Sequence, residues 1–458
     1  MVRVFNSYVP VRTLILLGGE IATVCASFAM GVLIQFRENT GFVLADEYGV
    51  WKILTITALA LLCSHFMDPD DIQWLVTPGE MYPRTLMLVG ALSFLLAGVT
   101  FAFPSFQVGH SVFLIGLCIL APAWILWRWA YGRLIFLPAF RERVYLVGDG
   151  VLAKRIMEAI RTRAELGMDI VGWSGEHNNG NSSREFLGKE LKELGKRSAV
   201  DRVIIALANR RSTMPVNELL ELRLNGVRVD EGTSLLEKMS CKIEVDDLYP
   251  SWMIFGEGFR LGRWPWYFRR LVSVLLALVL SILALPVIPN IAILIWLTSP
   301  GPILYKQKRV GLRGEVFDCY KFRTMRRDAE ADSGPTWASD DDPRITKVGK
   351  FLRRTRLDEI PQLWNVLRGD MAFVGPRPER PEFVKKLSQE IPYYPLRHMA
   401  RPGITGWAQI NYGYGSSVEE AKEKLRYDLY YLRNTSVALD LLIVFRTMRA
   451  VVVGRGVR

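Results

Sequence analysis

Two adjacent acidic residues, Asp358 and Glu359, stand inside a strongly basic stretch of the chain. The basic residues that precede and follow the pair are Lys347, Lys350, Arg353, Arg354, Arg356, Arg368 and Arg377. A carboxylate can attack phosphorus or hold a divalent metal, and cations bind the phosphate oxygens of an anionic substrate. This combination predicts phosphoryl-transfer chemistry centred on Asp358 and Glu359.

The composition predicts a chain that is partly membrane-embedded and partly cytosolic. Half of the 458 residues are hydrophobic and the net charge is +12, while the mean hydropathy is +0.16. Residues 299–458 hold 29 Lys and Arg against 19 Asp and Glu, a net +10. A basic domain beside a membrane typically meets anionic headgroups or phosphates. No zinc-finger spacing or RNP-like run supports nucleic acid as a partner, and five scattered cysteines without a CxxC pair indicate neither a disulfide framework nor a zinc site.

Four apolar runs in residues 1–135 predict a transmembrane region. They cover residues 13–36, 51–67, 84–103 and 112–131, and each has about the length of a membrane-spanning helix. Arginines before the first run and after the fourth place both ends in the cytoplasm by the positive-inside rule. Glu20 lies inside the first run, and we interpret it as a structural rather than a functional carboxylate.

Residues 136–262 alternate strand and helix patterns and predict a Rossmann-like cytosolic domain. The turn Gly148-x-Gly150-x-x-Ala153 could hold a pyrophosphate at a helix N-terminus. However, no clear acidic residue ends the second strand to bind a ribose, and no Tyr-x-x-x-Lys pair occurs in this domain. A scaffolding or regulatory role is therefore favoured over cofactor binding.

A fifth apolar segment, within residues 263–298, is too long for one straight span. Its 31 residues, 268–298, would extend about 46 Å as a helix, against a hydrocarbon core of about 30 Å. Pro286 and Pro289 break it near the middle, and positive charge flanks both sides. These features predict a re-entrant helix with both ends in the cytoplasm; a tilted, kinked fifth span is the alternative.

Residues 299–458 contain the basic motifs of a small α/β catalytic domain. Lys321 and Arg323 stand two apart in an extended segment and are expected to share a face. The apolar residues after the acidic pair predict an amphipathic helix on the bilayer surface. Arg377 and Arg401 each lie in a proline- and glycine-rich loop that would display an arginine.

The motifs of this last region resemble those of the bacterial sugar transferases, or polyprenyl-phosphate phosphoglycosyl transferases. In order along the chain they are Ser299-Pro300-Gly301-Pro302, residues 321–325 (KFRTM), 357–367 (LDEIPQLWNVL), 375–379 (GPRPE) and 401–409 (RPGITGWAQ). The upstream spans and Rossmann-like domain resemble the large membrane-bound branch that initiates exopolysaccharide or O-antigen synthesis. One departure is visible: the family often has Arg-x-x-x-Asp where this chain has Arg269 and Ser273.

The resemblance implies a two-step transfer. Asp358 attacks the β-phosphorus of a UDP-sugar, UMP leaves, and undecaprenyl phosphate takes the sugar phosphate from the enzyme. Glu359 is expected to help hold Mg²⁺. The expected substrate-binding residues are Arg353, Arg377, Arg401, Lys321, Arg323 and Asp428.

The resemblance also implies a multi-pass protein of the bacterial inner membrane, with its catalytic domain facing the cytoplasm. The fold class expected is therefore mixed membrane α plus α/β. Related large members make a homodimer plausible, and the transferred sugar stays open between glucose, galactose and others. Two rival functions are a membrane-anchored NAD-dependent nucleotide-sugar dehydratase or epimerase, and a non-catalytic membrane scaffold of polysaccharide assembly. The scaffold explains the positive charge but not a carboxylate pair inside it.

Overall fold

The computed structural model describes most of the chain, in two compact units. The described residues are 2–4, 7–9, 11–45, 49–67, 75, 78–106, 109–135, 137, 141–148, 150–163, 166–174, 187–193, 200–207, 214–246, 263–299, 301–326, 329, 342–413 and 417–453. Unit 1 comprises Met1–Val2 and Tyr8–Ser240, and unit 2 comprises Arg3–Ser7 and Cys241–Arg458. A short two-stranded sheet of β1 (Val2–Val4) and β2 (Ser7–Val9) lies near the N-terminus.

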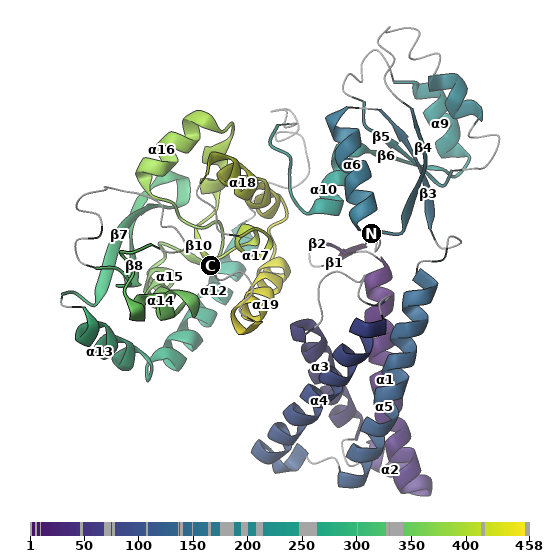
Figure 1. The fold of residues 1–458 in the computed structure, drawn as a ribbon, viewed down its shortest axis with the longest axis horizontal. Helices are drawn as coiled ribbons and strands as arrows, with labels where there is room; N and C mark the ends of the chain where they lie inside the picture. The colour runs from purple at the N-terminus through teal and green to yellow at the C-terminus, as the bar shows by residue number, and fades with distance from the viewer. Residues whose placement is uncertain are drawn as a thin grey trace. The chain divides into compact units, whose positions relative to one another are not determined.

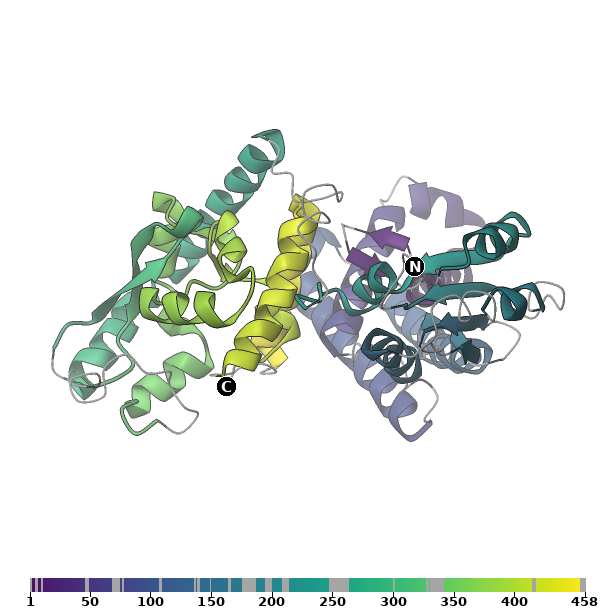
Figure 2. The same ribbon diagram turned by 90° about the horizontal axis from the view of Figure 1, so that it is seen from above.

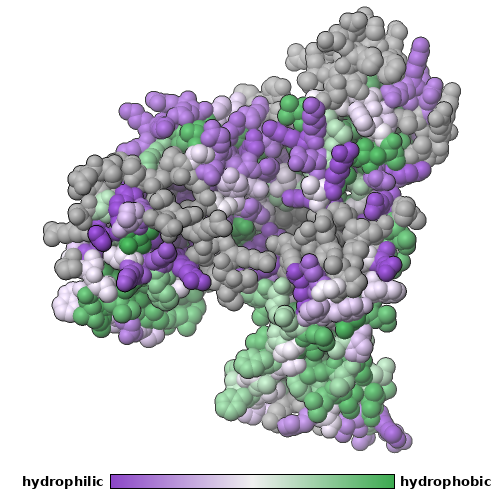
Figure 3. Space-filling model, viewed as in Figure 1, coloured by the Kyte–Doolittle hydropathy of each residue, from purple (hydrophilic) through white to green (hydrophobic). Residues whose placement is uncertain are grey.

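Long apolar helices form the first part of unit 1 (Figure 1). They are α1 (Val11–Phe36), α2 (Thr40–Ala45), α3 (Gly49–Met67), α4 (Pro78–Ala102) and α5 (His110–Ile135), with short 3-10 turns η1 (Arg37–Asn39) and η3 (Pro104–Phe106). Four stretches of them are long and apolar enough to cross a membrane: Val11–Ala45, Gly49–Met67, Gly79–Ala102 and His110–Leu134. Their outer surface is largely hydrophobic (Figure 3), as lipid contact requires. That each stretch crosses the bilayer stays a prediction.

The predicted structural role of Glu20 is supported by its contacts. Arg128 of α5 is fully buried and donates to Glu20 Oε1 through Nε at 2.9 Å and Nη2 at 2.6 Å. Ser64 of α3 donates to Glu20 Oε2 at 3.2 Å, and Arg128 Nη1 donates to Thr85 of α4 at 3.3 Å. One carboxylate and one guanidinium thus connect α1, α3, α4 and α5 inside the apolar bundle.

The rest of unit 1 is a parallel α/β sheet. Its elements are β3 (Glu142–Val147), α6 (Val151–Thr162), β4 (Met168–Ser174), β5 (Arg202–Ile205), α9 (Val216–Leu224), β6 (Arg228–Glu231) and α10 (Gly232–Ser240). The strand order is β4-β3-β5-β6, and every neighbouring pair is parallel. Helices α6 and α10 contribute to one apolar core, and α9 contributes to a second.

In the glycine turn after β3, the backbone passes very close to the backbone at Ala206. Gly148 has φ +127°, and a Cβ there would lie 2.5 Å from the carbonyl oxygen of Ala206, so only glycine fits. Asp149, within this turn, and Gly175 and Glu176, just after β4, lie outside the described residues. The Rossmann-like identity of this domain stays a prediction.

Unit 2 begins with a strap that packs on its C-terminal helices. Ile243 and Val245 are buried in the main core of the unit. Trp407 Nε1 donates to the carbonyl oxygen of Cys241 at 2.9 Å, and the amide of Ile243 donates to the carbonyl oxygen of Arg426 at 3.0 Å. The strap, Cys241–Asp246, therefore belongs with the domain that follows it rather than with the sheet that precedes it.

The proline-interrupted segment forms two helices, as the prolines predicted. Helix α12 (Arg263–Ala284) ends before a turn that contains Pro286, and α13 (Ile288–Thr298) begins with Pro289 in its first turn, where a missing amide is tolerated. The 11 residues of α13 rise about 16 Å, too short to cross a bilayer alone. The end of α12, the turn and α13 expose apolar side chains, including Leu285, Ile293, Trp296 and Leu297, and Figure 3 shows a hydrophobic surface on this part of unit 2.

The start of α12 is attached to the C-terminal part of unit 2. Arg269 donates to Asp440 Oδ2 through Nε at 2.7 Å and also contacts Tyr431. Ser273, where the family often has aspartate, accepts a hydrogen bond from the amide of Phe373 at 3.3 Å. Asp440 thus provides Arg269 with a carboxylate partner from a distant part of the sequence.

The remaining elements form a small α/β domain (Figures 1 and 2). Strands β7 (Leu304–Val310) and β8 (Val316–Phe322) make an antiparallel hairpin around η6 (Leu312–Gly314), and β9 (Ala372–Val374) pairs in parallel with β10 (Gly403–Thr405). The helical elements are α14 (Lys347–Arg354), η7 (Leu357–Glu359), α15 (Gln362–Arg368), α16 (Pro381–Glu390), η8 (Tyr394–Met399), α17 (Trp407–Asn411), α18 (Val418–Arg433) and α19 (Val437–Val453).

The apolar face of α15 corrects one prediction. The sequence analysis expected this face to lie on the bilayer, but Leu363 and Val366 are buried in the core of unit 2. Trp364, on the opposite side of the helix, is 60% exposed. Amphipathic periodicity shows that a helix has an apolar face, but it does not say whether protein or lipid covers that face.

Candidate active site

The acidic pair lies on a short turn between two helices. Helix α14 ends at Arg354, and Arg356 then adopts a left-handed conformation with φ +55° and ψ +17°. This conformation costs a non-glycine residue roughly 1–2 kcal/mol. It ends the first helix and starts η7, which contains Asp358 and Glu359. Both carboxylates are only 7% exposed, so the turn places two acidic groups in the protein interior at the edge of solvent.

Glu359 is surrounded by cations. Its Oε1 accepts from Arg377 Nη2 at 2.7 Å and from Lys321 Nζ at 3.0 Å, and Arg356 Nη1 lies 3.9 Å from Oε2. Burial alone would raise the pKa of this carboxyl, but the charges of Arg377, Lys321 and Arg356 outweigh burial and hold the pKa far below its usual range. Glu359 is therefore ionised at neutral pH.

Asp358 differs from its neighbour. Within the described part of the chain it makes no hydrogen bond or ion pair. Burial and the adjacent Glu359 charge raise the pKa of its carboxyl, against the lowering effect of Lys321, Arg353 and Arg377. A buried carboxylate with raised basicity and no partner holding its oxygens is suited to act as a nucleophile.

Three of the predicted cations surround the carboxylates from different elements. Lys321 comes from β8 and Arg377 from the loop after β9, and both contact Glu359. Arg353 of α14 donates through Nε to Thr324 Oγ1 at 2.9 Å and lies near enough to Asp358 to lower its pKa. The turn at Arg356 explains how Arg353 reaches the pair, which a continuous helix would not allow.

The side chain of Arg323 does not reach the same region as the side chain of Lys321. It is buried, and its Nη2 donates to the carbonyl oxygen of Ser299. Strand β8 ends at Phe322, so the alternation that would place Lys321 and Arg323 on one face stops between them. Arg323 instead ties the end of the hairpin to the end of α13.

The two predicted arginine loops lie side by side through close backbone contact. Gly375 donates to the carbonyl oxygen of Thr405 at 2.9 Å, and Gly403 donates to that of Pro376 at 2.9 Å. A Cβ on Gly375 would lie 2.2 Å from the carbonyl oxygen of Arg401, so a side chain at this position would separate the loops. The loops therefore bring Arg377 and Arg401 into one region.

Arg401 contacts an aromatic ring rather than the acidic pair. Its Cζ lies 4.8 Å from the ring centroid of Trp266, near the start of α12. Among the described residues it has no carboxylate partner. Its guanidinium therefore remains available for an anion near the membrane helix.

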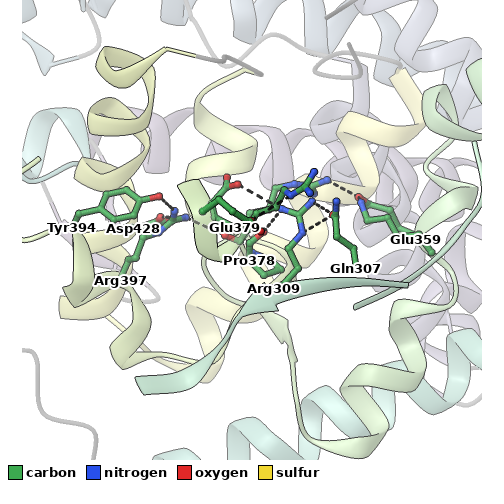
Figure 4. Close-up of polar contacts among 12 residues, drawn as sticks. Gln307, Arg309, Glu359, Pro378, Glu379, Tyr394, Arg397 and Asp428 are labelled. Atoms are coloured by element: carbon green, nitrogen blue, oxygen red, sulfur yellow. Dashed lines mark hydrogen bonds and ion pairs between the residues drawn. The ribbon is translucent and has the colours of Figure 1, made fainter. Parts of the chain in front are cut away.

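Asp428 lies in a separate polar cluster (Figure 4). It is 1% exposed and pairs with Arg397 Nη2 at 2.8 Å. Arg397 in turn donates to Tyr394 Oη at 2.6 Å and to the carbonyl oxygen of Arg377 at 3.1 Å. The structure does not bring Asp428 to the carboxylates, and its expected contact with substrate stays a prediction.

Two residues near the site were not predicted as site residues. Arg356 was recognised only as part of the basic run, and Arg397 was not singled out. Arg356 would have been predicted as a site residue if the turn between Arg353 and Asp358 had been expected. However, no feature of the local sequence indicates that an arginine adopts a left-handed conformation there. Arg397 acts through a carbonyl group, and the sequence gives no sign of such a contact.

The two carboxylates are suited to bind a metal ion that is also coordinated by the phosphates of the substrate. Among the residues that the structure describes, no three His, Cys, Asp or Glu side chains gather into a metal-binding cluster. Mg²⁺ is commonly bound through one or two carboxylates together with substrate phosphates and water. Glu359 Oε2 has a single cation at 3.9 Å, and Asp358 has no partner in the described residues, so both retain ligand capacity.

The fold and this site define a membrane-associated phosphoryl-transfer enzyme. Residues 264–454, which include every predicted site residue, match the bacterial sugar transferase family. A relative from Escherichia coli K12, a UDP-glucose:undecaprenyl-phosphate glucose-1-phosphate transferase, is 35% identical over 321 residues, 67% of each chain. The chain therefore belongs to the bacterial sugar transferase family.

Other relatives differ in the sugar that their names specify. A UDP-N-acetylgalactosamine-undecaprenyl-phosphate N-acetylgalactosaminephosphotransferase from Aeromonas hydrophila is 44% identical over 192 residues, 42% of this chain and 45% of the relative. An undecaprenyl-phosphate glucose phosphotransferase from Komagataeibacter xylinus is 32% identical over 322 residues, 69% of this chain and 60% of the relative. The match thus spans 45% of the Aeromonas protein, 60% of the Komagataeibacter protein and 67% of the Escherichia coli protein.

Proposed function

We propose that this protein transfers a sugar 1-phosphate from a UDP-sugar to undecaprenyl phosphate and releases UMP. The observation that carries the proposal is the asymmetry of the acidic pair: Asp358 is buried and has no partner among the described residues, while Glu359 is fixed by Lys321 and Arg377. The relatives' names, which specify undecaprenyl-phosphate sugar-phosphate transfer, support the same reaction. The transfer would be the first membrane step in building an exopolysaccharide or O-antigen.

The proposed chemistry has two displacements at one phosphorus atom. A carboxylate oxygen of Asp358 attacks the β-phosphorus of the UDP-sugar, and the bond from that phosphorus to the bridging oxygen breaks. UMP leaves with the electron pair. A phosphate oxygen of undecaprenyl phosphate then attacks the same phosphorus, and the bond to Asp358 breaks, which restores the carboxylate. A covalent intermediate lets one site handle two bulky anionic substrates in succession.

The surrounding cations bind and orient the phosphates in this proposal. Arg353, Arg377 and Arg401 present planar guanidinium groups that can hold phosphate oxygens in pairs. Glu359 would hold Mg²⁺, which when bound would neutralise charge on the diphosphate. Glu359 also fixes Lys321 and Arg377, so that their charges face the reacting phosphate.

Contacts of α12 and α13 support a re-entrant arrangement. Helix α12 packs against α15, β9 and α19, while α13 packs against α14, and its Ile291 and Ile295 share a core with Leu352. Both halves of the broken segment are thus attached to the same small domain. A straight crossing would separate those attachments by the thickness of the bilayer. We therefore propose that the domain stays on the cytoplasmic face of the bacterial inner membrane, where UDP-sugars are found.

The test is UMP release from a panel of UDP-sugars, with the full-length protein in detergent or nanodiscs, Mg²⁺ and polyprenyl phosphate. We expect UMP from at least one UDP-sugar, and labelled sugar phosphate on the protein when the lipid is omitted. UMP release that strictly requires the lipid, with no labelled protein, would refute the covalent route. NAD-dependent conversion of a UDP-sugar would favour the dehydratase or epimerase, and lipid binding without UMP release would favour the scaffold.

A further inference from the structure

A buried ion pair lies behind the loop that carries Arg377. Arg397 of η8 and Asp428 of α18 are 5% and 1% exposed, and their Nη2 and Oδ2 atoms are 2.8 Å apart. Tyr394 accepts a second hydrogen bond from Arg397 Nη1 at 2.6 Å. Two buried partners therefore fix the guanidinium of Arg397 in one orientation.

The same guanidinium holds the backbone at Arg377. Arg397 Nη2 donates to the carbonyl oxygen of Arg377 at 3.1 Å. On the next residue, the carbonyl oxygen of Pro378 accepts from Arg309 Nη1 at 3.0 Å. Figure 4 shows Arg397 and Arg309 approaching the loop from different sides. Pro376 and Pro378 remove backbone donors on both sides of Arg377, and these side-chain contacts add to the backbone hydrogen bonds that Pro376 and Glu379 accept from Gly403 and Val310.

The side chain of Arg377 points the other way, into the site. Its Nη2 donates to Glu359 Oε1 at 2.7 Å. The polar contacts thus run from Asp428 through Arg397 to the backbone of Arg377, and from its side chain to Glu359. Asp428, which is 1% exposed, is the first residue in this series of contacts.

We propose that Arg397, oriented by Asp428, is a positioning residue that fixes the Arg377 loop so that the Arg377 guanidinium stays against Glu359 and the donor phosphates. This inference rests on the proposed function for its catalytic consequence. Its structural part, the ordering of the loop, stands independently and can be measured without turnover.

Arg397→Lys is the most direct variant. Lysine keeps the buried positive charge opposite Asp428, but a single ammonium group cannot reproduce the forked contacts to Asp428, Tyr394 and the Arg377 carbonyl. We expect faster hydrogen exchange in the segment 375–380 and a UMP-release rate about tenfold lower, corresponding to about 1.4 kcal/mol of transition-state stabilisation. If the lysine variant does not fold, Asp428→Asn is used, with the same expectation.

Leu425→Ala is the matched control. Leu425 is fully buried on α18, the helix that carries Asp428, and its truncation destabilises the same helix without touching Arg397. We expect a lower melting temperature, but unchanged exchange in segment 375–380 and UMP release per folded enzyme within about twofold of wild type. A purely structural role for Arg397 would make the two variants behave alike.

A double-mutant cycle with Arg377→Ala tests whether Arg397 acts through Arg377. If it does, Arg397→Lys should lower UMP release by less than about twofold once Arg377 is already alanine. Additive losses, or unchanged exchange at segment 375–380 in a folded Arg397→Lys protein, would overturn the inference. If wild type releases no UMP from any UDP-sugar, the proposed function fails, and the exchange comparison still decides whether Arg397 orders the loop.

Discussion

The two units bury charge in opposite ways. Among the described residues of the helical part of unit 1, the carboxylate of Glu20 pairs with the guanidinium of Arg128, and Ser64 and Thr85 add hydrogen bonds. At the candidate site in unit 2, two carboxylates lie among four cations: Lys321, Arg353, Arg356 and Arg377. In the described part of the chain, the first cluster pairs one negative charge with one positive charge, whereas cations outnumber carboxylates in the second.

This difference separates a structural cluster from a chemical one. A carboxylate and a guanidinium that pair inside an apolar bundle fix how the helices pack. Where guanidinium and ammonium groups outnumber the carboxylates beside them, a bound anion can compensate the excess positive charge. The position of charge inside a fold therefore says less about function than whether that charge is already compensated.

The largest expected effect comes from removing the carboxylate that has no partner. Asp358→Asn keeps the shape of the side chain but removes the nucleophile, so we expect UMP release to fall by more than about 10³-fold. Because this carboxylate makes no hydrogen bond or ion pair within the described residues, the variant should fold normally. Thermal unfolding and UMP release measure the two properties. Near wild-type product formation would remove Asp358 from the nucleophilic role.

An intermediate effect is expected when the Glu20–Arg128 pair loses its negative charge. Glu20→Gln leaves Arg128 charged inside the apolar bundle, at a cost of about 3 kcal/mol, so the full-length protein should melt at a lower temperature in detergent. UMP release per folded enzyme should be unchanged.

Adding Arg128→Met to Glu20→Gln provides the control. An apolar side chain of similar length removes the uncompensated charge and should recover much of the lost stability. A Glu20→Gln protein as stable as wild type would show that the pair does not hold the bundle together.

The smallest effect concerns pH. Burial raises the pKa of Asp358, so its ionised form costs folding free energy, and we expect Asp358→Asn to melt at a higher temperature than wild type where Asp358 is ionised. As pH falls through that raised pKa, the folded protein takes up a proton and the cost of the buried charge disappears. The melting-temperature advantage of Asp358→Asn should therefore shrink between neutral and mildly acidic pH. An advantage that grows on acidification would contradict a raised pKa.

Local patterns in the sequence predicted many of the elements but fewer of the contacts. Apolar run length identified the long helices of unit 1, and Pro286 and Pro289 marked the break between α12 and α13. The clustering of charge around residues 347–377 marked the candidate site, whose role in catalysis stays a prediction. The long helices and the break between them were predictable because each follows from the length or period of a single segment.

Contacts between distant segments could not be predicted in the same way. The period of α15 was correct, but its apolar face packs against protein and not lipid. Arg269 meets Asp440, and Arg397 meets both Asp428 and the Arg377 carbonyl, across long stretches of sequence. The left-handed conformation of Arg356 could not be predicted either, because arginine has no local preference for it.

The strap Cys241–Asp246 has a practical consequence for anyone who transplants this enzyme into another architecture. The match to the family model starts at residue 264, but Ile243 and Val245 fill the interior of unit 2, and Glu244 pairs with Arg426 at 3.0 Å. A chimera joined at residue 264 would leave those sites empty. A chimera joined at residue 241 would include the strap, so the core of unit 2 would stay filled.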